Sequence, residues 1–272
     1  MTDIEPSTAP VSASDAGAFF DRYAANWEAF YTDSSEHRRA FDYLNRQRQL
    51  LQLVDAFVLP ESHILEFGCG AGHTACQLIM RGHRLTCLDV SPEMIQATRR
   101  TLDRAGQTAH LQVGQVRDLV AAGKELFDVI VGMGVMEYIE DHGAMFEQLA
   151  VLLKPGGICM LSFPNARSPI RRLERGMKRA VAYPLALITG KERYLDIALR
   201  PSQLHAPQDV RLRLERSGFV IEQCRYLSYG FRIGSFWVPP LPIVRRMEET
   251  LAASAVRWLG RNYIVVGRRV TK

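Results

Sequence analysis

The sequence predicts an α/β fold: a mostly parallel sheet of seven strands, the last of them antiparallel, with helices on both faces. Five apolar segments alternate with helical segments between residues 63 and 164, and this alternation is typical of a parallel sheet with crossover helices. Two later apolar segments, 220–227 and 263–270, complete the seven, and the second ends the chain without a following helix. We expect one domain over residues 16–272, after a disordered lead of residues 1–15.

Local signals place the individual elements. Ser91 followed by Pro92 is a typical helix start, because serine caps the first turn and proline fits its first position. Lys154-Pro155-Gly156-Gly157 is typical of a helix stop and turn. Two segments, 165–206 and 228–261, fit no strand–helix unit and are predicted to be insertions on the substrate side. The expected early strands are 63–67, 85–89, 109–114, 127–133 and 158–164, and the expected helices are two within 16–57, then 72–81, 91–104, 115–122, 143–153 and 207–219.

Composition excludes several classes of protein. Hydrophobic residues make up 47% and charged residues 23% of the chain, which is typical of a globular protein and not of a disordered or collagen-like one. The first 17 residues lack the apolar stretch of a secretory signal, and the five cysteines have no CxxC spacing. We therefore expect a cytoplasmic protein with reduced thiols. The net charge of +5 is concentrated in residues 165–182, so no general nucleic-acid-binding surface is expected.

A glycine-rich segment, EFGCGAG at residues 66–72, follows the first expected strand. Open α/β sheets bind nucleotide-like ligands at such turns, at the carboxyl ends of their strands. A dinucleotide site would need G-x-G-x-x-G, but residue 73 is histidine, and no phosphate-binding lysine follows. Glu66 would repel a phosphate and instead suits a positively charged group. A tight turn alone would explain the glycines but not this acid.

A second acid, Asp89, ends the next expected strand, 19 residues after Gly70. A carboxylate there accepts hydrogen bonds from both hydroxyls of a ribose. A ligand with a ribose and a positive centre but no phosphate matches S-adenosylmethionine. We therefore expect this cofactor, with Glu66, Gly70 and Asp89 in its site.

Four segments carry a resemblance to a known superfamily. They are ILEFGCGAG (64–72), LTCLDVSPEMI (85–95), FDVIVGMGVMEYIED (127–141) and LLKPGG (152–157). Together they resemble class I S-adenosylmethionine-dependent methyltransferases, which implies a Rossmann-like fold, over about residues 41–165. The chain is most similar to the ubiquinone-biosynthesis O-methyltransferase group. That similarity rests on LNRQR at residues 44–48, on Met133 and the Met136-Glu137-Tyr138 segment, and on Asn165, which opens an insertion.

The resemblance implies a set of cofactor contacts. In that group, the residues that match Arg48, Gly68, Asp89 and Met133 contact the cofactor. Gln115 departs from the pattern, because many methyltransferases have an aspartate there that contacts adenine, although an amide can replace that contact. The expected cofactor-binding residues are Arg48, Glu66, Gly68, Cys69, Gly70, Asp89, Val90, Gln115, Val116 and Met133.

Three polar residues after the fourth expected strand are candidates for catalysis. An oxygen acceptor must lose a proton when it is methylated, and Glu137, Tyr138 and His142 could assist. A polar helix start or a solvated loop would also explain them, and Tyr138 stands where the similar group usually has histidine. The spacing of Glu137, Asp141 and His142 matches no strong metal-binding pattern, so no metal is expected. The aromatic residues within 16–57 predict helices that either cover the cofactor or pack on the sheet edge.

Residues 165–190 combine six basic side chains with an apolar stretch at 180–188. Such a combination suits the anionic inner face of a membrane, and a lid helix with a solvated basic face explains it as well. Peripheral membrane contact through this segment is one expectation, and the oligomeric state is not predicted.

These features predict a methyltransferase that acts on a small molecule, at an oxygen of an apolar or lipid-linked compound. A soluble metabolite, sugar or natural product is the alternative acceptor. A nucleic-acid methyltransferase is disfavoured, because Met133-Gly134-Val135-Met136 stands where base methylation needs an N-P-P-[YF] motif. A non-catalytic cofactor-binding protein would bind the cofactor without turnover.

Overall fold

The structure of the chain is a computed structural model. It describes residues 17–18, 20–21, 41–123, 126–189, 203–233 and 236–270. The expected lead, residues 1–15, lies outside the described residues. Of the two helices expected within 16–57, the second is α2 (Phe41–Phe57), and most of the first also falls outside the described residues.

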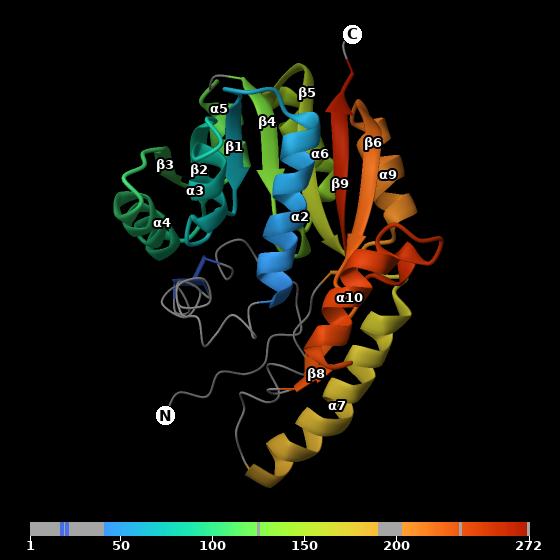
Figure 1. The fold of residues 1–272 in the computed structure, drawn as a ribbon. Coiled ribbons are helices and arrows are strands. Elements are labelled where there is room, and N and C mark those ends of the chain that lie inside the picture. Colours follow the sequence, from blue (N-terminus) through green and yellow to red (C-terminus); the bar gives the residue numbers. More distant parts are fainter. Residues whose placement is uncertain are drawn as a thin grey trace.

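Seven strands form one sheet in the order β3-β2-β1-β4-β5-β9-β6 (Figure 1). Neighbouring strands from β3 to β5 pair in parallel, whereas β9 pairs antiparallel with both β5 and β6. The predicted sheet, with its antiparallel last strand, is therefore confirmed. The strands are β1 (His63–Phe67), β2 (Arg84–Asp89), β3 (His110–Val113), β4 (Phe127–Gly132), β5 (Leu153–Pro164), β6 (Phe219–Leu227) and β9 (Asn262–Arg269).

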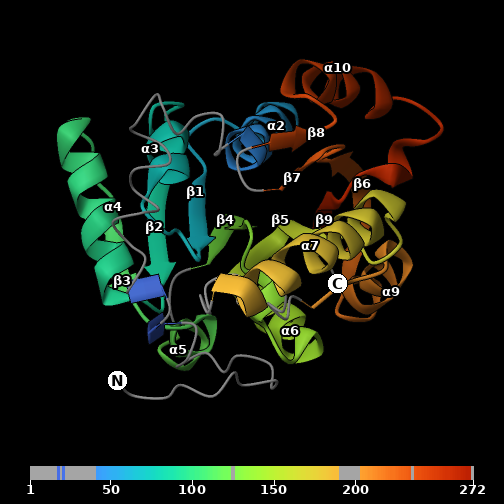
Figure 2. The ribbon, with the colours of Figure 1, turned by 90° about the horizontal axis from the view of Figure 1, so that it is seen from below.

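Helices cover both faces of this sheet, as Figure 2 shows in a view along it. Successive residues of β1 point to opposite faces, so Leu65 packs in a core with α5, α6 and α9, and Ile64 packs in a second core with α2, α3 and α4. The helices are α3 (His73–Ile79), α4 (Pro92–Arg104), α5 (Val116–Ala121), α6 (His142–Leu152), α7 (Pro169–Thr189), α9 (Pro207–Arg216) and α10 (Leu241–Leu251), with 3-10 turns η1 (Met136–Tyr138) and η2 (Arg257–Leu259).

The sequence predicts one helix start, at Ser91-Pro92, and one helix stop and turn, at residues 154–157, and the structure confirms only the first in full. Ser91 caps α4, because its Oγ accepts a hydrogen bond from Met94 N at 3.0 Å, and Pro92 is the first helical residue. The start expected for β5 is wrong: the strand begins at Leu153, not at residue 158. Leu153 pairs with Phe127, and an irregularity in the register then separates this pair from the regular pairing. The Pro-Gly-Gly turn is thus absorbed within the strand.

The two insertions lie near the carboxyl ends of the parallel strands (Figures 1 and 2). The first contains α7, which is 21 residues long. The two ends of this insertion lie side by side, because Asn165 forms an isolated β-bridge with His205. The second contains the hairpin of β7 (Phe231–Ile233) and β8 (Phe236–Val238), followed by α10. Among the described residues, no helix is both long and apolar enough to cross a membrane.

A buried carboxylate fixes α10 against the rest of the domain. Glu248 accepts hydrogen bonds from the backbone N–H groups of Ser228 and Tyr229 at 3.1 and 2.7 Å, and from Asn45 Nδ2 of α2 at 2.7 Å. Its side chain is 2% exposed. Because buried polar groups are costly unless they are satisfied, these bonds specify how the second insertion meets α2.

A second buried network fixes α7. Arg261, just before β9, donates one hydrogen bond to Glu174 Oε2 at 2.7 Å and another to Asp42 of α2. Lys178 donates to the other oxygen of Glu174 at 2.6 Å. Burial raises the pKa of Glu174, but the charges of Arg261 and Lys178 outweigh it and lower that pKa to about 2. The network joins α2, α7 and the start of β9.

Candidate active site

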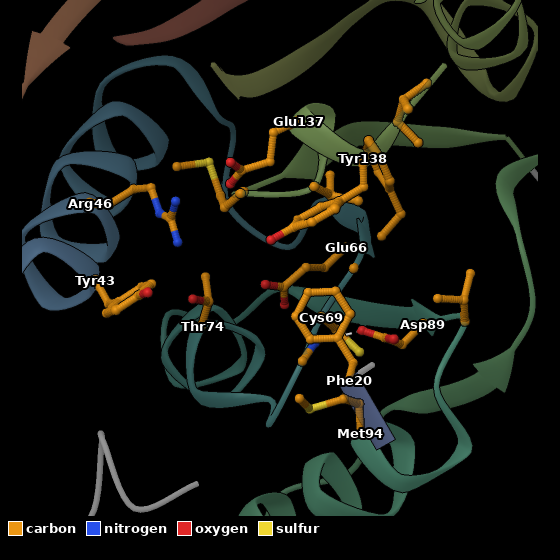
Figure 3. Close-up of a pocket in the computed structure, with 18 of the residues that line it drawn as sticks. Phe20, Tyr43, Arg46, Glu66, Cys69, Thr74, Asp89, Met94, Glu137 and Tyr138 are labelled. Carbon is orange, nitrogen blue, oxygen red and sulfur yellow. Dashed lines mark hydrogen bonds between the residues drawn. The ribbon is translucent and has the colours of Figure 1, made fainter. Parts of the chain in front are cut away.

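A cavity of about 520 Å³ lies at the carboxyl ends of β1, β2 and β4, and its volume is typical of a small-molecule site. The glycine loop forms its floor, and residues of η1, α2 and α7 form other walls. Figure 3 shows side chains from β1, α2 and η1 pointing into one space. Nine of the ten expected cofactor-binding residues line the cavity, namely Glu66, Gly68, Cys69, Gly70, Asp89, Val90, Gln115, Val116 and Met133.

The three glycines of the loop all have positive φ angles, but they face different surroundings. A Cβ on Gly72 would lie 2.9 Å from Thr98 Cα, so this glycine lets the loop pack against α4. A Cβ on Gly68 would lie 3.0 Å from the side chain of Val135. A Cβ on Gly70 would meet nothing within 4 Å. Gly70 therefore leaves its space to a ligand in the cavity.

Asp89 holds the glycine loop in place from the end of β2. Its Oδ2 accepts a hydrogen bond from Gly70 N at 2.9 Å, and its Oδ1 accepts one from Ser91 N at 3.0 Å. Burial raises the pKa of this carboxyl, and the backbone N–H donors oppose the rise. The Val90 backbone also hydrogen-bonds to this carboxyl. Because a carboxylate offers about four acceptor positions, Asp89 can still accept a hydroxyl group from the cavity.

Glu66 is 3% exposed and stands at the centre of the cavity (Figure 3). Within the described part of the chain, its Oε2 is buried without a hydrogen-bond partner. Burial, and then the charge of Asp89, raises the pKa of this carboxyl to about 8. A buried carboxyl in this state gains most from a ligand that brings a positive charge.

Two of the three candidate catalytic residues lie in the same cavity. Glu137 and Tyr138 lie on η1, and Figure 3 shows both pointing toward the space above Glu66. Phe20 packs edge-on against the Tyr138 ring, with ring centres 5.4 Å apart, and it lines the cavity too. A residue from the N-terminal segment thus contributes to the lining of the cavity.

The expectation for His142 is wrong in its geometry. Its ring is 5% exposed, and its Nε2 lies 2.9 Å from the Met136 carbonyl oxygen. It packs against the His205 ring at 4.4 Å and lines a separate cavity with Arg213. Burial lowers the pKa of His142, and burial together with the charge of His142 lowers the pKa of His205 to about 4. His142 therefore contacts η1 through the Met136 carbonyl and not through the cavity.

The structure does not place Arg48 in the cavity, and a neighbouring arginine lines it instead. Arg48 donates a hydrogen bond to Asn45 Oδ1 at 2.9 Å and does not line the cavity, whereas Arg46 does. Residues two apart on a helix point in nearly opposite directions. The guanidinium of Arg46 rests on the backbone of Gly134, where a Cβ would lie 2.7 Å from Nη1.

Helical spacing would have identified several lining residues that the sequence interpretation missed. On α2, Tyr43, Arg46 and Gln47 follow the i, i+3, i+4 pattern of one helix face. The same pattern occurs on α7. Its cavity-lining residues are Arg171, Glu174, Arg175 and Lys178.

A known protein family matches the part of the chain that forms much of this cavity. Residues 64–157, which include the glycine loop, Asp89, Glu137 and Tyr138, match the family described as "Methyltransferase domain". This match places a methyltransferase domain over the part of the chain that contains the glycine loop and η1.

Its relatives are more specific in name. The chain is 28% identical to a ubiquinone biosynthesis O-methyltransferase of Xanthomonas campestris pv. campestris over 204 residues, which is 75% of this chain and 83% of the relative. It is 31% identical to the enzyme of that name from Xanthomonas axonopodis pv. citri over 150 residues, 55% of this chain and 61% of the relative.

Solved structures share the architecture. The magnesium protoporphyrin IX methyltransferase of Synechocystis PCC 6803, crystallised with bound SAM, matches with a TM-score of 0.61. The match covers 98% of this chain and 100% of that one at 14% sequence identity. At this identity, the match supports the fold.

Proposed function

We propose that the protein transfers the methyl group of S-adenosylmethionine to an oxygen of a small-molecule acceptor that is apolar or lipid-linked. The observation that carries this proposal is the single cavity in which Glu66, the glycine loop and Asp89 face Glu137 and Tyr138. One half suits the cofactor, and the other half offers groups that can take a proton. The names of the relatives support an oxygen acceptor of the ubiquinone-precursor type.

The geometry of the cavity supports a cofactor-binding role for each of several residues. Glu66 would pair with the ammonium group of the methionine moiety, because its buried Oε2 needs a positive partner. Asp89 would accept a ribose hydroxyl at its remaining acceptor position, and Gly70 would let the ligand approach the main chain. Gln115 and Val116, at the start of α5, line the same cavity and would flank the adenine.

The protein's contribution to the chemistry is positioning and proton removal. The bound cofactor supplies an electrophilic methyl group on a sulfonium. The two walls of the cavity hold the acceptor oxygen in line with that group, which lowers the entropic part of the barrier. Glu137 accepts the proton of the acceptor hydroxyl, and Tyr138 beside it orients that hydroxyl through a hydrogen bond. Phe20 lines the cavity and packs against Tyr138, where it would help to keep water from the reacting atoms.

Asp89→Ala is expected to weaken S-adenosylmethionine binding by about 2 kcal/mol, or roughly 30-fold, because a charged acceptor is lost. The free N–H of Gly70 would add to this loss. Titration calorimetry measures the change. Asp103→Ala, at an exposed position of α4, is the control and should bind normally. An unchanged affinity in Asp89→Ala would contradict the ribose assignment.

Cofactor binding is expected to depend on pH through Glu66. Its raised pKa of about 8 means that the carboxyl is protonated near pH 6.5 in the free protein. Pairing with an ammonium group requires the carboxylate, so binding releases close to one proton there, and affinity rises by up to about tenfold per pH unit. The rise ends near pH 8, where the α-amino group of the ligand itself titrates.

The stability of the free protein depends on pH through the same residue. The raised pKa of Glu66 stabilises the folded state below about pH 4.5, and this contribution is lost as the pH rises through about 8.

Calorimetry in two buffers of different ionisation enthalpy counts the released protons. Glu66→Gln should bind more weakly and release none, with no rise in affinity between pH 6 and 7.5. Two results would contradict the pairing of Glu66 with the ammonium group. Either the unaltered protein releases no proton on binding, or Glu66→Gln still releases one.

Peripheral membrane contact through residues 165–190 is a further part of the proposal. Arg171 and Arg175 line the cavity, so the basic surface facing solvent is smaller than the sequence suggests. Arg167 is exposed, and Leu173 is 55% exposed on α7. We expect Arg167→Glu with Leu173→Asp to reduce sedimentation with phosphatidylglycerol vesicles at low salt but not with phosphatidylcholine vesicles. Negligible binding of the unaltered protein to both would contradict membrane contact.

A transfer assay separates the apolar acceptor from the alternative, a soluble metabolite. Labelled S-adenosylmethionine is incubated with the protein and either a lipid and quinol extract or an aqueous metabolite extract. Label in the product of the first extract supports the proposal. Label only in the product of the aqueous metabolite extract would contradict the apolar acceptor and support a soluble metabolite.

A further inference from the structure

Arg171 of α7 lines the cavity and is held there by two neutral acceptors. Its Nε donates to the carbonyl oxygen of Arg261 at 2.9 Å, and its Nη2 donates to Asn262 Oδ1 at 2.6 Å. Both acceptors lie at the start of β9. Because neither carries a charge, these bonds fix the direction of the guanidinium group and leave its positive charge to act on other groups.

Asn262 is itself held in one orientation. Its Nδ2 donates to Ser228 Oγ at 3.1 Å, so its Oδ1 faces Arg171. Ser228 is fully buried and has a φ of +66°, which a residue with a side chain adopts only where its surroundings enforce it. Its N–H donates to Glu248 Oε2 at 3.1 Å, and its carbonyl oxygen accepts from Arg261 N at 3.0 Å. The end of β6 and the start of β9 thus fix Arg171.

Two acids act on Arg171 through their charges. Burial, and then the charge of Arg261, lowers the pKa of Arg171 to about 10, while Glu174 and Glu137 oppose the change. Glu174 already accepts hydrogen bonds from Lys178 on one oxygen and from Arg261 on the other. Glu137 lies on η1 and points into the cavity (Figure 3). It is the acid through which the charge of Arg171 reaches the proposed reaction.

The interaction between Arg171 and Glu137 is mutual. A positive charge near a carboxyl favours the carboxylate, just as the carboxylate favours the cation. A base must be ionised before it can accept a proton. We infer that Arg171 is a positioning residue for methyl transfer: held in place by Asn262, it keeps Glu137 ionised. This inference rests on the proposed function and adds a residue that acts through the base.

Other charged and titratable groups line the same cavity, and the test must separate their effects from that of Arg171. Besides Glu174 and Lys178, they are Arg46 on α2, Glu66 on β1, His73 on α3, Asp89 on β2, Tyr138 on η1 and Arg175 on α7. Acids among them favour the protonated form of Glu137, and cations favour its ionised form. A variant of Arg46, the cation on the α2 wall, therefore accompanies the variants of Arg171.

The main test measures the ionisation of Glu137 directly and needs no acceptor. The full chain, labelled with ¹³C at the glutamate side-chain carboxyls and saturated with S-adenosylhomocysteine, is titrated by NMR, and Glu137→Gln identifies the signal by its loss. We expect Arg171→Gln to raise the midpoint by at least about one pH unit, because a nearby opposite charge lowers a carboxyl pKa by about 1–3. Arg171→Lys should retain most of the effect. Arg172→Gln, at an exposed position of α7, is the control and should leave the midpoint unchanged.

Asn262→Asp tests the same inference with Arg171 still in place. It keeps the shape of the side chain but gives Arg171 a charged partner, so the midpoint of Glu137 should again rise. If Arg171→Gln fails to fold, Asn262→Asp decides. A midpoint that moves in neither variant, or that follows Arg46→Gln and not Arg171→Gln, would overturn the inference.

Methyl transfer is measured in parallel, so that the inference and the proposed function can fail separately. At saturating S-adenosylmethionine, label transfer to the lipid and quinol extract should increase with pH as Glu137 ionises, and Arg171→Gln should move this increase to higher pH. Transfer with an unchanged pH dependence in Arg171→Gln would overturn the positioning role alone. Failure of S-adenosylhomocysteine to bind, or a shifted Glu137 titration without any label transfer, would instead contradict the proposed function.

Discussion

Replacement of Gly70 by valine is expected to abolish S-adenosylmethionine binding while the domain stays folded. The Cβ position of Gly70 is open within 4 Å, so a valine side chain would occupy space that the ligand needs. The residue has a φ of +56°, and an L-residue with a side chain pays about 1–2 kcal/mol in that region. Calorimetry measures the binding, and thermal unfolding followed by circular dichroism measures the stability.

Gly106→Val is the matched control for this experiment. Gly106 has a φ of +64° and nothing within 4 Å of its Cβ position, and it does not line the cavity. It should show a similar loss of stability with normal cofactor binding. Normal binding by Gly70→Val would mean that the glycine loop is only a turn, and the cofactor site would have to lie elsewhere.

Arg261→Met is expected to destabilise the protein by about 3–5 kcal/mol, because it leaves Glu174 and Asp42 without their shared buried cation. Arg261 is 5% exposed and bonds to both acids. Urea unfolding gives the change in free energy. The shape of the cavity should change as well, because the network holds α7 in place and α7 forms part of the cavity wall.

The pH dependence of this effect has a defined sign. The pKa of Glu174, lowered to about 2, stabilises the folded protein above pH 4.5, and this stabilisation is lost as the pH falls toward 2. Arg211→Met removes an exposed pair with Glu215 on α9 and should cost less than about 1 kcal/mol. A loss as small as this in Arg261→Met would show that the buried network contributes little.

The sheet was predictable because its signals are local. Each parallel strand is a short apolar run. Ser91 and Pro92 mark the start of α4 by themselves, because Ser91 accepts a hydrogen bond from within the first turn and Pro92 is the first helical residue. The start of β5 was not predictable, because its first residues pair with β4 across an irregularity that only the tertiary structure creates. The position of α7 was not predictable either, since it depends on Arg261, which is 87 residues from Glu174.

The cofactor half of the site was more predictable than the acceptor half. Glu66, Gly70 and Asp89 are positioned by strand ends that the sequence identifies. Arg46 and His142 depend instead on which way a helix face turns: Arg46 lines the cavity where Arg48 was expected, and His142 turns inward to the Met136 carbonyl. The basic residues of α7 were noticed as a charge cluster, but only the fold shows that two of the arginines face the cavity.

The central claim is that methyl transfer from S-adenosylmethionine takes place in the cavity between the glycine loop and η1. The most direct measurement is transfer of a labelled methyl group from S-adenosylmethionine to acceptors in a lipid and quinol extract, with unaltered protein and with Glu137→Gln and Tyr138→Phe. We expect label in a small-molecule product with the unaltered protein, and a loss of at least about tenfold in one of the two variants, with cofactor affinity unchanged. Cofactor binding without label transfer to any extract, or transfer that neither variant affects, would contradict this claim.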